Sequence, residues 1–437
     1  MAFLFTFSTQ VFAVDFTVNL TTDQHDASLA DGICDVNLAT AELECSLRAA
    51  VEQANNLGSN DRVLFNLPAN STITLTVANG GEIPITNNGT LEIIETATSN
   101  LRISGNNTSR VFFVNPGANL MINGVTITNG RTTVGSNGGG IRNNGTLTLT
   151  NSTVSGNTAN LGGGINIFNG TLTLTNSTVS GNTAAGFGGG IFNREGTLNL
   201  TSVTVAFNSA TNTGGGVYNE FGTANLSNTI VANNTAAAAP DFSGAILSTS
   251  SFNLIGNGQG TTDITNGTNS NQVGTSANPI DPKLAPLANN GGATQTHALL
   301  FGSPAIDQGN SFGLTTDQRG SARPVDNPSI INATGGNGAD IGAFEVQLAP
   351  TAAQVTIGGR AITANGRGIS NVIISLTDAS GTVRTARTTA FGRYRFTNVQ
   401  AGETYIITAK SKRFQFSQPT QVLNVNEDMD SVNFVAY

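Results

Sequence analysis

The chain has 437 residues, a net charge of −8 at pH 7 and only 11 % charged residues, against roughly 25 % in an average soluble domain. The acidic balance argues against a nucleic-acid-binding protein, and the presence of only two histidines, His25 and His297, nearly excludes multi-histidine metal centres. Because the sequence contains no apolar run of about 18 residues, we expect no membrane span.

Residues 1–13 are predicted to be the remnant of a signal peptide. Their apolar stretch ends at 11–13 with small residues where a signal peptidase cuts. No Lys or Arg precedes it, so either the signal is atypical or the sequence starts inside a longer signal, and we favour the second. The alternative to a signal is a buried N-terminal strand. Export predicts a secreted or cell-surface protein. In that oxidising compartment Cys34 and Cys45, the only cysteines, should form a disulfide.

Residues 14–70 are predicted to form an N-terminal cap. The run CSLRAAVEQAN at 45–55 has apolar residues at helical spacing and predicts a short amphipathic helix. The run resembles the CSLREA motif that opens many bacterial β-helix proteins, with Ala49 in place of the usual Glu. Four acidic residues lie upstream, namely Asp23, Asp26, Asp31 and Asp35. They predict either a structural calcium site, since hard cations bind several carboxylates, or a solvated acidic loop, which the absence of EF-hand spacing favours.

Residues 71–275 consist of repeats. Segments of the GGGI type begin at Gly138, Gly162, Gly188 and Gly214. Each is followed by a unit with period-two alternation, such as TLTLT at 146–150, which is typical of β-strands. Short strands separated by Gly and Asn, at a repeat of about 25 residues and without helices, predict the coils of a right-handed parallel β-helix.

Stacked coils place equivalent residues in columns. Three inward columns are predicted: Leu147, Leu172, Leu198 and Ala224; Leu149, Leu174, Leu200 and Leu226; and Val154, Val179, Val205 and Val231. A fourth column falls at a turn, where stacked amides can hydrogen-bond along the axis: Asn157, Asn182, Asn208 and Asn234. Phe192 and Tyr218 should stack outward on adjacent coils and offer exposed rings to a sugar, unless they fold over a neighbouring turn.

This repeat region resembles the pectin-lyase-like superfamily of secreted bacterial β-helices, including polymorphic outer-membrane-type repeats with the GGGI signature. The resemblance implies a surface or secreted protein. Many members of the superfamily are polysaccharide lyases or hydrolases, and many others are non-catalytic.

Residues 276–346 contain four blocks in order: DPKLAPLANNGGATQTHAL, GSPAIDQG, DQRGSARP and DIGAFE. Together they resemble the choice-of-anchor Q module, which follows β-helices in exported bacterial proteins. The charged residues of the blocks are Asp307, Asp317, Arg319, Arg323 and Asp340. We expect a structural network of Asp–Arg pairs closing the C-terminal coils, with an active site as the alternative.

Residues 354–437 alternate throughout and predict seven short strands in a small β-sandwich. The segment TAFGRYRF at 389–396, followed by VQAG at 399–402, resembles the carboxypeptidase-regulatory-like, or Cna-B-like, family, which implies a transthyretin-like fold. Arg360 stands on the first strand where some relatives carry an isopeptide-forming Lys, so that bond is not expected. The whole chain is therefore predicted to be all-β.

Candidate catalytic residues are sparse, because the repeats contain only two aspartates, Asp241 and Asp263, which lie well apart. We therefore expect a non-catalytic carbohydrate-binding, adhesive or spacer protein, with a polysaccharide lyase or glycoside hydrolase as the alternative. The basic C-terminal region should bind acidic glycan, through Arg393 and Arg395 with Arg384 and Arg387 on neighbouring strands. Beyond the calcium considered above, no cofactor is expected. The expected partner is a polysaccharide or cell-surface glycan, bound by a monomer.

Overall fold

A computed structural model describes residues 14–86, 89–95, 100–132, 135–347, 354–378, 381–401, 403–425 and 427–437. The chain divides into two compact units, Met1–Gln347 and Leu348–Tyr437. The expected signal remnant, residues 1–13, lies outside the described residues. The fold is nearly all-β, a parallel β-solenoid followed by a β-sandwich, as the sequence predicts.

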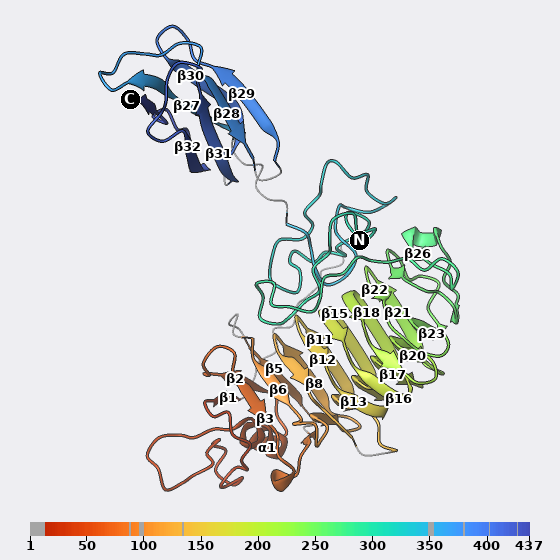
Figure 1. The fold of residues 1–437 in the computed structure, drawn as a ribbon. Coiled ribbons are helices and arrows are strands. Elements are labelled where there is room, and N and C mark those ends of the chain that lie inside the picture. The colour runs from red at the N-terminus through yellow and green to blue at the C-terminus, as the bar shows by residue number, and fades with distance from the viewer. Residues whose placement is uncertain are drawn as a thin grey trace, which may run out of the picture. The chain divides into compact units, whose positions relative to one another are not determined.

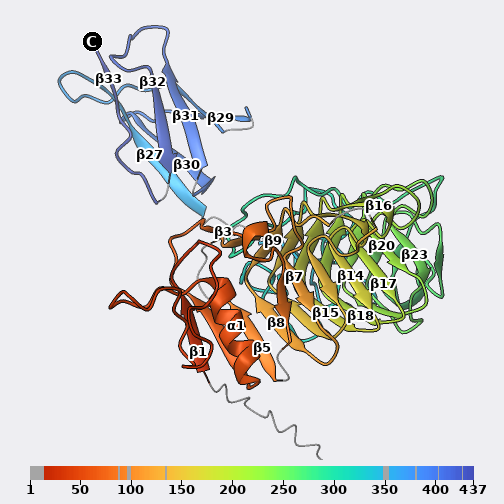
Figure 2. The same ribbon diagram turned by 90° about the horizontal axis from the view of Figure 1, so that it is seen from below.

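The solenoid begins with a cap in which helix α1 (Leu47–Leu57) lies beside strand β1 (Val14–Val18), as Figure 2 shows. The Ser46 hydroxyl caps the helix by accepting from the Ala49 N–H at 3.1 Å, and Gly58 ends it in the left-handed region at φ 64°. The predicted helix is confirmed. Its apolar face is buried over the first coil.

The coils form about seven turns with three parallel sheets, shown in Figure 1. The first sheet contains, besides β1, the strands β2 (Asp61–Phe65), β3 (Thr72–Thr74), β5 (Thr90–Ile94), β6 (Arg102–Ser104), β8 (Asn119–Asn123), β9 (Thr126–Thr128), β11 (Thr146–Thr150), β12 (Thr153–Ser155), β15 (Thr171–Ser180), β18 (Thr197–Ala206), β21 (Thr223–Ser227), β22 (Ile230–Ala232), β24 (Leu254–Ile255) and β26 (Gln272–Val273).

The second sheet contains β4 (Ile83–Ile85), β7 (Phe112–Val114), β10 (Ile141–Asn143), β14 (Ile165–Phe168), β17 (Ile191–Arg194), β20 (Val217–Asn219), β23 (Phe242–Ala245) and β25 (Thr261–Thr262). The third contains β13 (Thr158–Leu161), β16 (Thr183–Phe187) and β19 (Ser209–Ala210). Two short 3₁₀ helices, η1 (Val77–Asn79) and η2 (Thr268–Ser270), lie in turns.

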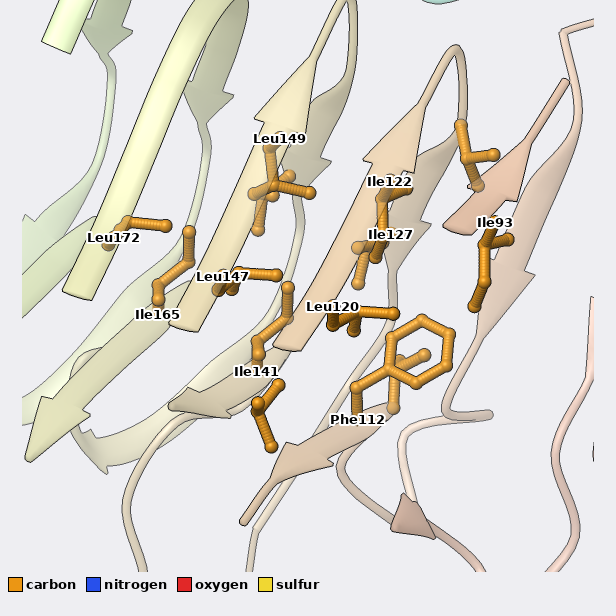
Figure 3. Packing of buried hydrophobic residues seen from close by; sticks show 14 of the residues in the cluster. Ile93, Phe112, Leu120, Ile122, Ile127, Ile141, Leu147, Leu149, Ile165 and Leu172 are labelled. Carbon is orange, nitrogen blue, oxygen red and sulfur yellow. The ribbon is translucent and has the colours of Figure 1, made fainter. Parts of the chain in front are cut away.

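The register of the coils confirms the predicted columns. Leu147 pairs with Leu172, Leu172 with Leu198 and Leu198 with Ala224, and all four are buried. The second Leu column and the Val column follow the same register. Figure 3 shows Leu147 and Leu120 pointing toward Ile141 and Phe112 from the second sheet, so facing strands fill the interior of each coil.

The predicted asparagine ladder is also confirmed. The Nδ2 of Asn157 donates to Oδ1 of Asn182 at 2.9 Å, and Asn182 donates likewise to Asn208. Asn208 continues the ladder to Asn234 at 3.0 Å, and Asn234 donates to Oδ1 of Asp241 at 3.0 Å. The amides thereby pair polar groups that would otherwise be buried without partners.

Residues 276–346, called here the covering segment, do not form C-terminal coils, and that expectation was wrong. They contain no helix or strand, only isolated bridges such as Leu284 with Leu299, and they run back alongside earlier coils (Figure 1, teal). Thr153 Oγ1 donates to the Gln295 carbonyl, and Thr178 Oγ1 to Oε1 of Gln318. The segment lacks period-two alternation, so it covers outward polar residues of the coils instead of adding strands.

The C-terminal unit is the predicted seven-stranded sandwich. One sheet has the order β30–β27–β33 and the other β29–β28–β31–β32. The strands are β27 (Gln354–Thr363), β28 (Ile373–Thr377), β29 (Val383–Arg387), β30 (Arg393–Gln400), β31 (Glu403–Lys410), β32 (Thr420–Val425) and β33 (Phe434–Ala436). Inward residues of both sheets, including Ile357, Ile374 and Phe434, form one core.

Candidate functional site

The four aspartates of the cap bind protein groups. Asp23 is buried and accepts from Arg48 Nε at 2.7 Å. Asp26 accepts from the Asp35 N–H and from Gln53, whereas Asp31 and Asp35 accept from nearby backbone N–H groups. Within the described residues, no group of three or more His, Cys, Asp or Glu side chains is placed to hold a metal ion. The geometry therefore lends the calcium prediction no support.

The predicted disulfide between Cys34 and Cys45 is present. It joins the acidic loop to the residue before the helix cap Ser46, and both cysteines are buried. The bond thus fixes the loop against the start of α1.

Phe192 and Tyr218 are in register, but they do not form the expected exposed platform. Phe192 is only 3 % exposed, and its ring lies 5.4 Å from that of Tyr218. Phe187, from the end of β16, stacks on Tyr218 at 5.2 Å. Alternation puts both rings on the opposite face of the sheet from the core residues Ile191 and Val217, and there Phe187, at the end of β16, stacks on Tyr218.

The charged residues of the covering segment form a buried structural network. Arg319 pairs with Asp317 at 2.7 Å, and Arg323 pairs with Glu345 at 2.8 Å, a partner the sequence did not indicate. The Asp340 carboxylate accepts from the backbone N–H groups of Asp307 and Val346. Burial first, and then the nearby Glu345 charge, raise the pKa of Asp340 to about 7.

A group of three exposed side chains and one half-buried side chain, Arg360, lies at the β30–β27–β33 sheet of the C-terminal unit. We call it the arginine face, and it consists of Arg360, Phe391, Arg393 and Arg395. Strand β30 alternates, so Tyr394 and Phe396 enter the core while Arg393 and Arg395 point outward. Arg360 on β27 lies directly opposite Arg393 in the antiparallel register.

Local contacts fix parts of the arginine face. Arg360 donates to the Phe391 carbonyl through Nε at 3.3 Å and Nη2 at 3.2 Å, while the Phe391 side chain is 75 % exposed. Arg395 donates to Thr356 Oγ1 at 3.0 Å. Thr356 also donates two hydrogen bonds to Asp428 and, together with the Arg395 charge, lowers the pKa of that carboxyl. Among the described residues, no salt bridge involves an arginine of this face.

Arg384 and Arg387, which were also expected to contribute to glycan binding, are not part of the arginine face. They lie on β29, which belongs to the opposite sheet from β30. Arg384 donates to the backbone carbonyls of Thr397 and Asn398 and lies over the Phe396 ring, so it joins the two sheets. Arg387 is exposed on the four-stranded sheet. The expected cluster of four arginines is therefore divided.

Sequence reasoning missed Arg360 and Phe391 as members of the site. Phe391 precedes Gly392, which has a φ of 75°, so the ring stands at a turn tip. That turn could have been anticipated from the FGR run. The neighbouring position of Arg360 depends on the strand register, which the sequence does not show.

Residues 356–436 match the family model of the carboxypeptidase regulatory-like domain. The C-terminal unit carries this domain. Comparisons with curated proteins and with solved structures gave no significant match. Among the described residues, no helix is long and apolar enough to cross a membrane.

Proposed function

We propose that this chain is an exported protein whose carboxypeptidase regulatory-like domain binds acidic polysaccharide without catalysis, through its arginine face. The supporting observation is the pair of half-buried Arg360 and exposed Arg393, side by side on paired strands next to the exposed Phe391 ring. In this proposal the solenoid is the structural support of the protein.

The chemistry of the arginine face suits an acidic sugar. A guanidinium group can bind a carboxylate or sulfate through two parallel hydrogen bonds, and an aromatic ring packs against the apolar face of a sugar. Residues 351–437 contain nine basic and five acidic residues, a net charge of +4 in a chain of net charge −8. The domain thus attracts the anions that the rest of the chain repels.

Export is supported by the Cys34–Cys45 disulfide, since such bonds persist in oxidising compartments. It also agrees with the resemblance of residues 45–55 and 276–346 to segments of exported bacterial β-helix proteins. The lyase or hydrolase alternative needs paired carboxylates. Asp241 is buried and accepts from Asn234 and Asn257, whereas Asp263 is exposed, so these two residues do not form such a pair.

The test is binding of the full chain to polygalacturonate, with neutral dextran as the reference polymer, across a series of NaCl concentrations. The double variant Arg360→Ala/Arg393→Ala should weaken binding about tenfold or more, because it removes two charge-assisted contacts. Phe391→Ala should weaken binding to a smaller extent. Binding by the unaltered protein should fall as salt rises.

The matched control is Arg387→Ala, which removes an exposed positive charge from the opposite sheet of the same domain. We expect it to change the affinity less than about twofold. Equal losses in Arg387→Ala and Arg393→Ala would show attraction to net charge alone, and unchanged binding in the double variant would refute the site.

A further inference from the structure

The two histidines differ in their surroundings, and His297 lies in a pocket that the proposed function does not use. The covering segment brings it against the coils, where its Nε2 lies 2.8 Å from Oγ of Ser180 at the end of β15. The two residues are 117 positions apart in sequence. Both are buried, with 3 % of each side chain exposed.

The hydrogen bonds of His297 define its tautomer. Nδ1 lies 2.7 Å from the Ala285 carbonyl oxygen, which can only accept, so Nδ1 carries the proton. In the neutral ring Nε2 is then an acceptor, and the Ser180 hydroxyl donates to it. This is the arrangement of a serine nucleophile and a general base, with a backbone carbonyl orienting the base where other enzymes use a carboxylate.

The surroundings keep the ring neutral and in place. Burial lowers the pKa of His297, while its hydrogen bond to Ala285 opposes that effect. The backbone hydrogen bond from Ala285 N to Ala298 O, at 2.8 Å, fixes the loop that carries the histidine. The Phe207 ring packs on the imidazole at 5.0 Å between centroids. Phe207 has a φ of 58° because it stands at a turn position where Gly156 and Gly181 of the preceding coils have φ values of 67° and 66°.

A cavity of about 410 Å³ opens onto this pair. It is lined by Ser180, Phe207, Leu284, Pro286, Leu287 and His297. No charged side chain is among these residues, and apart from Ser180 and His297 all of them are apolar. Such a cavity suits a short acyl chain, with the reacting carbonyl held against the serine.

We propose that Ser180 and His297 form a serine esterase site for short-chain acyl esters, of the kind that decorate polysaccharides. Ser180 Oγ bonds to the acyl carbon while its proton passes to His297 Nε2. The ester C–O bond then breaks, and the alcohol leaves with that proton. Water then adds to the acyl carbon and gives a proton to Nε2. The bond between the acyl carbon and Ser180 Oγ breaks, Nε2 returns the proton to Oγ, and the carboxylic acid leaves.

The coil register provides matched variants. Ser155 occupies the equivalent position in the preceding coil, and Ala206 occupies it in the next coil. Ser180→Ala therefore installs a side chain that a neighbouring coil already carries, and the variant should fold. Ser155→Ala is the control, because it removes a serine from the same column and Ser155 is not among the residues that line the cavity.

The experiment measures hydrolysis of p-nitrophenyl butyrate by the full chain, together with peptide mass spectrometry after treatment with a fluorophosphonate. We expect an adduct on Ser180, and a loss of turnover of about 100-fold or more in Ser180→Ala and His297→Gln. Ser155→Ala should stay within about twofold of the unaltered protein. The acid limb of the pH profile should have its midpoint below the ordinary histidine value of 6.5, because the lowered pKa keeps the base neutral.

Turnover that survives in Ser180→Ala, or the absence of an adduct on Ser180, would overturn the proposal. A purely structural hydrogen bond between Ser180 and His297 predicts a change in melting temperature with neither adduct nor turnover. The polysaccharide-binding proposal is independent of this result, because it rests on the other unit of the chain.

Discussion

The coils and the covering segment both bury polar side chains, but they pair these groups in different ways. In the coils, Asn157, Asn182 and Asn208 each donate to the equivalent residue of the next coil. In the covering segment, Arg323 pairs with Glu345 and Arg319 pairs with Asp317, and neither pair is repeated from coil to coil. Repetition lets asparagine provide a hydrogen-bond partner for the buried amide of every coil, whereas each buried polar group of the covering segment needs a partner of its own.

The largest effect should come from breaking an apolar column of the coils. Leu174→Asp places an unpaired charge where the side chain is fully buried, and it should lower the free energy of unfolding by several kcal/mol. Thr173→Asp, on the partly exposed outer face, should cost far less. Urea melts of both variants check this. Equal midpoints would mean that burial within the columns does not set the stability of the coils.

A smaller but still large effect is expected from the covering segment. Arg323→Met leaves the buried Glu345 carboxylate without its partner and should cost about 3–5 kcal/mol in urea melts. Arg194→Met is the control, since Arg194 is 46 % exposed and pairs only at the surface, where the loss should be about 1 kcal/mol or less. If adding Glu345→Gln to Arg323→Met failed to recover stability, the cost would not come from an unpaired charge.

The smallest effect per pH unit is a pH dependence that comes from the buried carboxyls of the covering segment. The folded pKa of Asp340, about 7, lies above its ordinary value of 3.8, so the folded state holds a proton that the unfolded state releases. The contribution of this proton to the free energy of unfolding is complete below about pH 4. It falls by up to about 1.4 kcal/mol per pH unit as the pH rises, and it is lost once the pH has passed through 7. The pKa of Glu345 is also raised, chiefly by burial, and acts in the same direction.

Urea melts of the unaltered protein and of Asp340→Asn between pH 5 and 8 test this. The unaltered protein should lose stability with rising pH more steeply than the variant. Parallel slopes would show that Asp340 does not titrate in this range.

The fold of the coils could be predicted because the repeat spacing of the sequence directly determines which residues stack. The spacing of Leu147, Leu172 and Leu198 already contains the strand register, and Asn157 and Asn182 mark the turn. The helix at 47–57 and the seven strands of the sandwich follow from spacing and alternation in the same way.

The sites were less predictable, because they depend on contacts between distant segments. The contact of Ser180 with His297 can be predicted only from the path of the loop that carries His297. The contact of Arg360 with Phe391 can be predicted only from the strand register. Alternation shows that Phe192 points outward, but it does not show that Phe187 stacks on its neighbour Tyr218. No local pattern in the sequence specifies which loop covers which face.

The asparagine ladder gives the solenoid a direction. Every amide donates the same way along the axis, from Asn157 through to Asn234, so the ladder is a row of aligned dipoles. It ends on Asp241, whose carboxylate accepts from Asn234 and, when ionised, has no proton to pass on. A duplicated coil could therefore be inserted between those that carry the ladder, where each amide finds its partner. The coils that follow Asp241, with strands β24 and β26, lie outside this ladder, so the ladder can lengthen from within while Asp241 closes its end.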